Sequence, residues 1–226
     1  NFSRNPAALF DAGLGVRSTI LVGSVSGTRK SVSVTKTHRW YEAFRPALFE
    51  TLRYTELPPA VESRHGWVRL PSEGFGTLLG KLADGSSGAL AAQERTRARN
   101  ASIGFKGATL YWLSVFLEDP PAYTRDGQPV AQSNIKRIWV EDERSALLTL
   151  AVLSSKLAFV WWWATGDDFN VTSGVLKNTP VDPGRLTVET QNELVAAARA
   201  LVEDYPNHLA FTPYAGKFMG NVVLSE

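Results

Sequence analysis

Residues 145–163 read Ser145-Ala-Leu-Leu-Thr-Leu-Ala-Val-Leu-Ser-Ser-Lys156-Leu-Ala-Phe-Val-Trp-Trp-Trp163 and are predominantly apolar. An acidic turn at Gly166-Asp-Asp168 follows, and then a short run with strand character, Phe169-Asn-Val-Thr172. The apolar run is longer than an ordinary strand, so it predicts a buried helix from about Asp142 to Trp163. The acidic residues at its start suit the positive end of a helix dipole.

Three polar residues, Ser154, Ser155 and Lys156, interrupt the apolar run. A lysine at the centre of a bilayer costs about 3 kcal/mol, so we expect a buried helix and no membrane span. The consecutive tryptophans Trp161 to Trp163 have two interpretations, as a platform on which bases stack or as a helix end packed against its neighbours. Three consecutive residues cannot share one helical face, which favours packing.

The composition of the chain predicts a globular protein. It has 226 residues, 44% of them hydrophobic, and 24 Lys and Arg against 22 Asp and Glu give a formal charge of +2. This charge is too small to indicate a nucleic-acid partner, so any DNA-binding surface must be a local patch. There is no cysteine, and the three histidines are far apart in sequence, so we expect no metal site. Met219 is the only methionine, and we therefore expect the chain to be a piece of a longer protein.

Local patterns predict an α+β fold. Two β-rich runs, 18–23 and 31–37, predict a hairpin, and Trp40, Phe44, Leu48 and Leu52 recur with the spacing of a helix that Pro46 kinks or divides. Residues 110–117 predict a buried strand, and residues 135–140 predict another short strand. Thr190-Gln-Asn-Glu193 matches a capping box before an apolar stripe, which predicts a helix that ends at Pro206. Residues 74–88 are rich in glycine and poorly periodic.

The densest positive segment is Arg95-Thr-Arg97-Ala-Arg99-Asn100, which Lys106 follows. Alternating arginines in an extended segment lie on one side and can follow a phosphate backbone or contact a base edge. A solvated loop or strand face explains the same pattern equally well. Lys136 and Arg137 extend the patch, so the candidate DNA-binding residues are Arg95, Arg97, Arg99, Lys106, Lys136 and Arg137.

Two other motifs have structural interpretations that we favour. Asp119-Pro-Pro-Ala-Tyr123 resembles the Asp/Asn-Pro-Pro-Tyr motif with which adenine methyltransferases hold a flipped base, but the extra alanine shifts the ring, which favours a strand-ending turn. Gly23-Ser-Val-Ser-Gly27-Thr-Arg-Lys30 has the wrong spacing for a phosphate loop and precedes a strand, which favours a hairpin turn.

Several segments, in order, resemble adenine-specific DNA methyltransferases of restriction-modification systems. Residues 10–23 are similar to a late strand of the catalytic domain, and residues 37–49 to the helix that leads into the recognition region. The remaining similar segments belong to the specificity domain of that family: Ser133-Asn-Ile-Lys136, Leu147 to Trp163, Gly166-Asp-Asp-Phe169, Pro180 and Gly216-Lys-Phe-Met-Gly-Asn221.

The resemblance implies that residues 1–57 are a β-hairpin and helix from the end of a catalytic α/β domain. Residues 58–226 are then a mixed α+β target-recognition domain. The chain has neither the glycine-rich S-adenosylmethionine motif nor an intact Asn-Pro-Pro-Tyr motif, so no catalytic or cofactor-binding residue is carried over. The expected cofactor, S-adenosylmethionine, belongs to the full-length protein.

The expected function is reading of double-stranded DNA while a catalytic half outside this chain flips and methylates adenine. The expected location is the cytoplasm, with no membrane partner. Two alternatives stay open. One is a protein-interaction module of a larger complex that contacts no DNA, and the other is an enzyme with an unrecognised carboxylate site.

Overall fold

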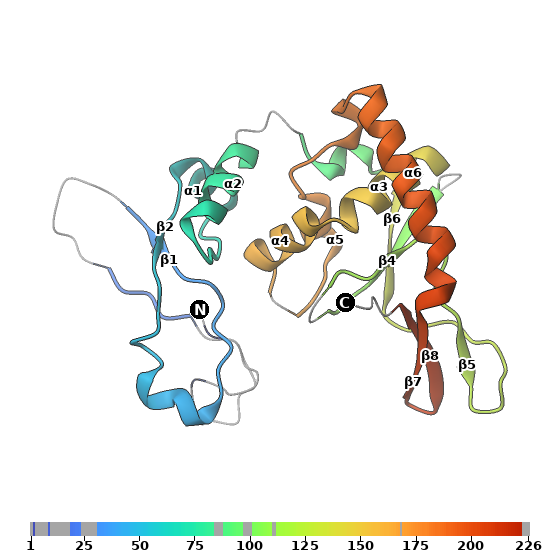
Figure 1. The fold of residues 1–226 in the computed structure, drawn as a ribbon, viewed down its shortest axis with the longest axis horizontal. Coiled ribbons are helices and arrows are strands. Elements are labelled where there is room, and N and C mark those ends of the chain that lie inside the picture. Colours follow the sequence, from blue (N-terminus) through green and yellow to red (C-terminus); the bar gives the residue numbers. More distant parts are fainter. Residues whose placement is uncertain are drawn as a thin grey trace. The chain divides into compact units, whose positions relative to one another are not determined.

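The structure is a computed structural model, and it describes residues 2, 9, 19–23, 31–83, 88–96, 101–109, 112–167 and 169–222. The chain divides into two compact units (Figure 1). The first unit consists of Asn1–Ser86 together with Trp163–Asp168, and the second consists of Ser87–Trp162 and Phe169–Glu226. The predicted boundary between residues 57 and 58 concerns the origin of the two segments and stays a prediction.

The first unit contains short elements around a small core. Strand β1 (Ser33–Val34) pairs antiparallel with β2 (Thr55–Glu56), and the 3-10 helix η1 (Glu42–Ala47) lies between them in sequence. Helices α1 (Pro59–His65) and α2 (Glu73–Ala83) follow and pack on each other. The buried side chains of one core cluster come from distant positions: Phe2, Leu9, Trp40 and Leu48.

Two local predictions for this unit are wrong. Residues 19–23 form no strand, and Ser33–Val34 of the run 31–37 pairs with Thr55–Glu56 instead of with 19–23, while residue 18 lies outside the described residues. The expected helix over residues 40–52 is only the six-residue η1, in which Pro46 lies. Proline lacks the amide donor that an α-helix needs at that position, and the buried side chains of Trp40 and Leu48 keep their places without a long helix.

The second unit is built on two three-stranded antiparallel sheets. In the first sheet, β3 (Ala101–Lys106) lies between β4 (Val115–Phe116) and β6 (Ile135–Val140). In the second sheet, β8 (Lys217–Val222) lies between β5 (Ala122–Thr124) and β7 (Leu209–Tyr214). The predicted strand at 135–140 is confirmed, whereas the one expected at 110–117 is only the two-residue β4, with residues 110–111 outside the described part of the chain.

The apolar run that predicts one helix forms two. Helix α3 (Glu143–Leu153) and helix α4 (Lys156–Thr165) meet at an angle of 66°. The break lies at Ser154 and Ser155, where the Ser155 hydroxyl donates to the Val152 carbonyl (2.6 Å) and accepts from the Ala158 amide (3.3 Å). The serine side chain thus ends one helix and caps the next, because it can bond backbone groups in place of the helix itself.

The remaining helices belong to the second unit, and the last of them is followed by the hairpin of the second sheet. Helix α5 (Ser173–Lys177) and the 3-10 helix η2 (Leu90–Gln93) contact each other, and the 3-10 helix η3 (Pro183–Arg185) precedes α6 (Val188–Asp204). The 3-10 helix η4 (Tyr205–His208) then leads into the β7–β8 hairpin (Figure 1). The predicted helix is confirmed in α6, but its N-cap is Thr187 and not Thr190, since the Thr187 hydroxyl accepts from the Thr190 amide.

Together, helices and antiparallel sheets confirm the predicted α+β class. Within the described residues, no single helix has the length and apolar character needed to cross a membrane. Helices α3 and α4 pass that test of length and composition only when they are taken together as a bent pair.

Candidate nucleic-acid interface

The β4–β3–β6 sheet has two chemically different faces. On one face, Ile103 and Phe105 of β3 lie opposite Ile138 and Lys136 of β6, and all but the lysine are buried. Side chains alternate along a strand, so the residues between them lie on the other face. That face, called the polar sheet face below, carries Ser102, Gly104 and Lys106 of β3, Ile135, Arg137 and Trp139 of β6, and the buried Phe116 of β4 opposite Gly104.

Arg137 is the central cation of the polar sheet face. Its Nη1 donates to the Ser102 hydroxyl (3.1 Å), and its Nη2 forms an ion pair with the Asp119 carboxylate. The side chains of Arg137 and Asp119 keep 31% and 42% of their surface exposed. The guanidinium has five N–H donors, so these two contacts leave it able to bind a further anion.

The two lysines of the predicted site lie on opposite faces of the sheet. Lys106 lies on the polar sheet face, and partial burial lowers its pKa because removal of water disfavours the charged ammonium. Lys136 lies on the other face, where its Nζ is 3.4 Å from the Val171 carbonyl oxygen. The sheet therefore brings Lys106 and Arg137 together and separates Lys136 from them.

Arg95 lies beside the end of β6. Its amide donates to the Trp139 carbonyl (2.7 Å), and its Nη2 pairs with the Glu141 carboxylate (3.1 Å). Its Nη1 donates to two nearby carbonyls, of Ala92 and Glu94, both at 2.9 Å. Arg97 and Arg99 lie outside the described residues, so the predicted alternation along residues 95–99 stays a prediction.

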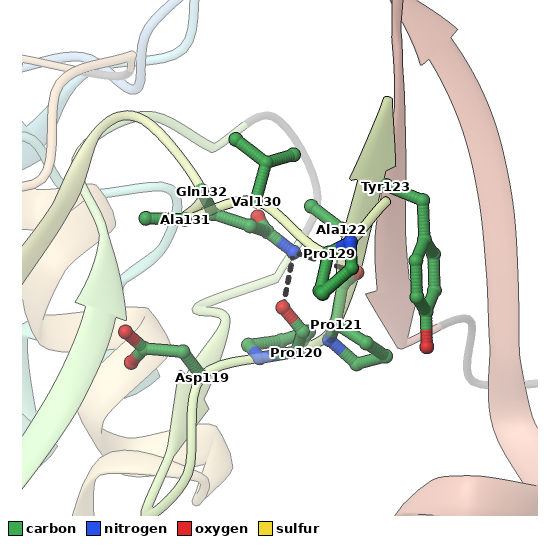
Figure 2. Close-up of a pocket in the computed structure, with 9 residues that line it drawn as sticks. All are labelled: Asp119, Pro120, Pro121, Ala122, Tyr123, Pro129, Val130, Ala131 and Gln132. Carbon is green, nitrogen blue, oxygen red and sulfur yellow. Dashed lines mark hydrogen bonds between the residues drawn. The ribbon is translucent and has the colours of Figure 1, made fainter. Parts of the chain in front are cut away.

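The segment from Asp119 to Tyr123 lines a pocket of about 330 Å³ with Pro129, Val130, Ala131 and Gln132. The Gln132 side-chain amide donates to the carbonyls of Pro120 and Gly220, each at 2.8 Å. Figure 2 shows that Asp119 and Tyr123 point away from each other, to opposite sides of this segment. In a motif that holds a base, the polar side chain and the aromatic ring must both contact the same base. Asp119 and Tyr123 do not point to one place, so this geometry favours the strand-ending turn.

The tryptophans pack as the favoured interpretation predicts. Trp161 and Trp162 are 2% and 0% exposed, so neither offers a ring face to a base. Their indole nitrogens donate to the carbonyls of Val175 (3.2 Å) and Asn170 (3.0 Å), respectively. Trp163, in the first unit, makes an edge-to-face contact with Phe75 at 6.4 Å between ring centroids.

Three exposed aromatic residues of the second sheet were not among the predicted site residues: Tyr123, Phe211 and Phe218. Neither 209–214 nor 217–222 alternates regularly between apolar and polar residues, so no periodic signal in the sequence points to them. Carboxylates offer no comparable site. In the described part of the chain, no group of three or more His, Asp or Glu residues is arranged to hold a metal ion.

Comparisons of the chain with protein-family models, with curated proteins and with solved structures found no match.

Proposed function

We propose that the chain is the target-recognition region of an adenine-specific DNA methyltransferase and that it binds double-stranded DNA. The resemblance of the segments quoted above supports the family, and the polar sheet face supports the partner. The observation that carries the proposal is that Lys106 and Arg137, which are distant in sequence, lie on the same partly exposed face. Arg95 lies at the end of the strand that carries Arg137.

The ion pair between Arg137 and Asp119 does not oppose this role. Both side chains are about a third exposed or more, and ion pairs of this kind contribute only about 0 to 1 kcal/mol. A phosphate that displaces Asp119 accepts charge-assisted hydrogen bonds from the same fork of N–H groups. The carboxylate then acts as a weak competitor that DNA displaces on binding.

In this proposal, the catalytic half lies outside the chain and supplies S-adenosylmethionine binding, base flipping and methyl transfer. The chain positions the duplex and reads bases for it. The proposed location is the cytoplasm. We expect that this chain alone neither binds S-adenosylmethionine nor methylates DNA, because its sequence has neither motif.

The test is fluorescence anisotropy with a labelled random-sequence duplex over about 50 to 200 mM salt, since phosphate contacts give binding without sequence preference. We expect salt-dependent binding. Arg137→Ala and Lys106→Ala should each weaken binding and reduce the salt slope by about one unit. Arg199→Ala is the matched control, because Arg199 is an exposed arginine of α6 that lies 4.0 Å from the exposed Glu143 carboxylate.

A second variant separates phosphate binding from a structural role of Arg137. Asp119→Asn removes the competing charge, so it should strengthen duplex binding severalfold while Arg137→Ala weakens it. Absence of salt-dependent binding by the wild type would refute the proposal. Equal effects of Arg137→Ala and Arg199→Ala on duplex affinity would show that the polar sheet face is a solvated surface with no role in binding.

A further inference from the structure

The β5–β8–β7 sheet also has one buried and one exposed face. Ala122 of β5 and Met219 of β8 are register partners, and both are buried. The alternate positions carry Tyr123, Phe211 and Phe218, which are 37%, 45% and 41% exposed. The register places Tyr123 directly opposite Phe218, and the Tyr123 and Phe211 ring centroids are 5.8 Å apart. These three rings are called the aromatic sheet face below.

Three neighbouring aromatic rings on an exposed sheet face need an explanation. Isolated exposed hydrophobic side chains are ordinary, but a contiguous group of this kind marks a binding surface. The face is also hollow. A pocket of about 330 Å³ is lined by the three rings together with Thr124, Arg125 and Gly127. This volume is at the lower end of the range for small-molecule sites.

A tight turn positions the one cation of this pocket. The Gly127 amide donates to the Thr124 carbonyl (3.0 Å), and the Gln128 amide donates to the Thr124 hydroxyl (3.0 Å). Gly127 has a φ of 79°, a conformation that glycine adopts without strain. Arg125 lies within this turn and is exposed, and no ion pair or hydrogen bond holds its side chain within the described part of the chain.

Aromatic rings beside a guanidinium suit a planar ring that carries a negative charge at its edge. An unpaired nucleobase stacks on aromatic side chains, and its adjoining phosphate attracts an arginine. We propose that the aromatic sheet face binds one unpaired base of DNA, with Arg125 on the neighbouring phosphate. The inference deepens the proposed function and rests on it, because a base leaves the duplex in the reaction that the catalytic half performs.

The test measures, by fluorescence anisotropy, the affinity of the whole chain for three labelled probes. These are a perfect duplex, the same duplex with one unpaired adenine, and a single-stranded oligoadenylate. We expect the unpaired adenine to raise affinity over the perfect duplex by about 5- to 100-fold. Phe211→Ala and Phe218→Ala should abolish this preference, whereas Phe218→Tyr should retain it because the ring still stacks. Arg125→Ala should weaken binding of the two probes that contain an unpaired base and reduce the salt slope of that binding by about one unit.

Lys217→Ala is the matched control, since Lys217 belongs to the same strand as Phe218 but lies on the opposite face. It should leave the preference for the unpaired adenine unchanged. Thermal unfolding followed by circular dichroism shows whether the alanine variants fold, and the Phe218→Tyr variant keeps the test decisive if they do not.

The outcomes separate this inference from the proposed function. Equal affinity of the wild type for the perfect and the unpaired duplex overturns the inference and leaves duplex binding standing. Ring-dependent binding of the single strand without duplex binding supports the inference and overturns duplex recognition. Ring-dependent binding of a proline-rich peptide, with no effect of the rings on any DNA probe, overturns the inference in favour of a protein partner.

Discussion

The guanidinium of Arg69 caps the C-terminal end of α4 through the carbonyl oxygen of Trp163. Nε and Nη2 lie 3.2 and 2.9 Å from that oxygen, and Nη2 also donates to the Gly166 carbonyl. The Arg69 amide donates to the Ala164 carbonyl at 3.1 Å. The last carbonyls of a helix have no partner within the helix and carry a partial negative charge, so a buried cation satisfies both needs.

Arg69→Ala should therefore destabilise the first unit by about 2 to 4 kcal/mol, because it leaves carbonyl groups without charge-assisted hydrogen bonds in a place where Arg69 itself is only 9% exposed. Urea unfolding followed by tryptophan fluorescence measures the change. Arg53→Ala is the control, because Arg53 is exposed and, within the described residues, its side chain donates to the nearby carbonyls of Glu50 and Leu52. A similar free energy of unfolding for both variants would contradict the capping role.

Gly104→Ala should cost about 1 to 3 kcal/mol through overpacking. A Cβ atom at Gly104 would lie 2.5 Å from Cε2 of the buried Phe116 ring, so the ring or the strand must move. Gly174→Ala in α5 is the control, since no atom lies within 4 Å of its added Cβ, and it should be neutral or stabilising by up to about 1 kcal/mol. Chemical unfolding of both variants checks the prediction. Equal free energies of unfolding would show that the Phe116 ring can move to accommodate the added Cβ at no cost in stability.

Thr187→Ala should destabilise α6 by about 1 kcal/mol, the usual cost of a lost N-cap. The Thr187 hydroxyl accepts from the Thr190 amide, while the capping box expected at Thr190 is absent. Thr190→Ala should thus cost clearly less than Thr187→Ala. Thermal unfolding of the two variants decides between the caps, and the reverse order of stability would restore the sequence-based assignment.

The stability of the first unit should rise with pH between about pH 5.5 and about pH 7.5. Burial lowers the pKa of His38 below its ordinary value of 6.5, and the charge of Lys36 lowers the pKa further. The unfolded chain then binds more protons than the folded one below that value, so acid favours unfolding. His38→Gln removes the titrating group, and its unfolding free energy should vary less with pH over this window; an unchanged pH dependence would assign the effect to other groups.

Local sequence patterns were sufficient to predict an element or its burial where the segment itself shows which residues are buried. The apolar stripe of α6 predicts that helix, and the consecutive tryptophans predict burial at a helix end. These features depend on neighbours within one or two turns or strand repeats, which the sequence displays directly. Composition likewise indicated that positive charge must be local, because the net charge is only +2.

The glycine-rich segment shows where such patterns fail. Residues 73–83 form α2 although glycine disfavours a helix. Gly76 and Gly80 face Pro58, and a Cβ atom at either position would lie 3.6 to 3.7 Å from that ring. These distances are ordinary van der Waals contact, so the packing does not require glycine at either position. The segment is nevertheless helical and buries Leu79 and Ala83 in the first unit, a gain that no local propensity contains.

The sequence by itself determined the α+β class, the strand at 135–140 and the helix before Pro206. The helix was predictable because its periodic apolar stripe encodes which side faces the core. Only the tertiary structure decided which cations share a face. The pairing of β3 with β6 places Lys106 with Arg137 and turns Lys136 to the other side, while the β5–β8–β7 register brings Tyr123 to Phe218. Residues so distant in sequence meet only when burial of the rest of the core fixes the strand register. A local sequence pattern does not determine that register.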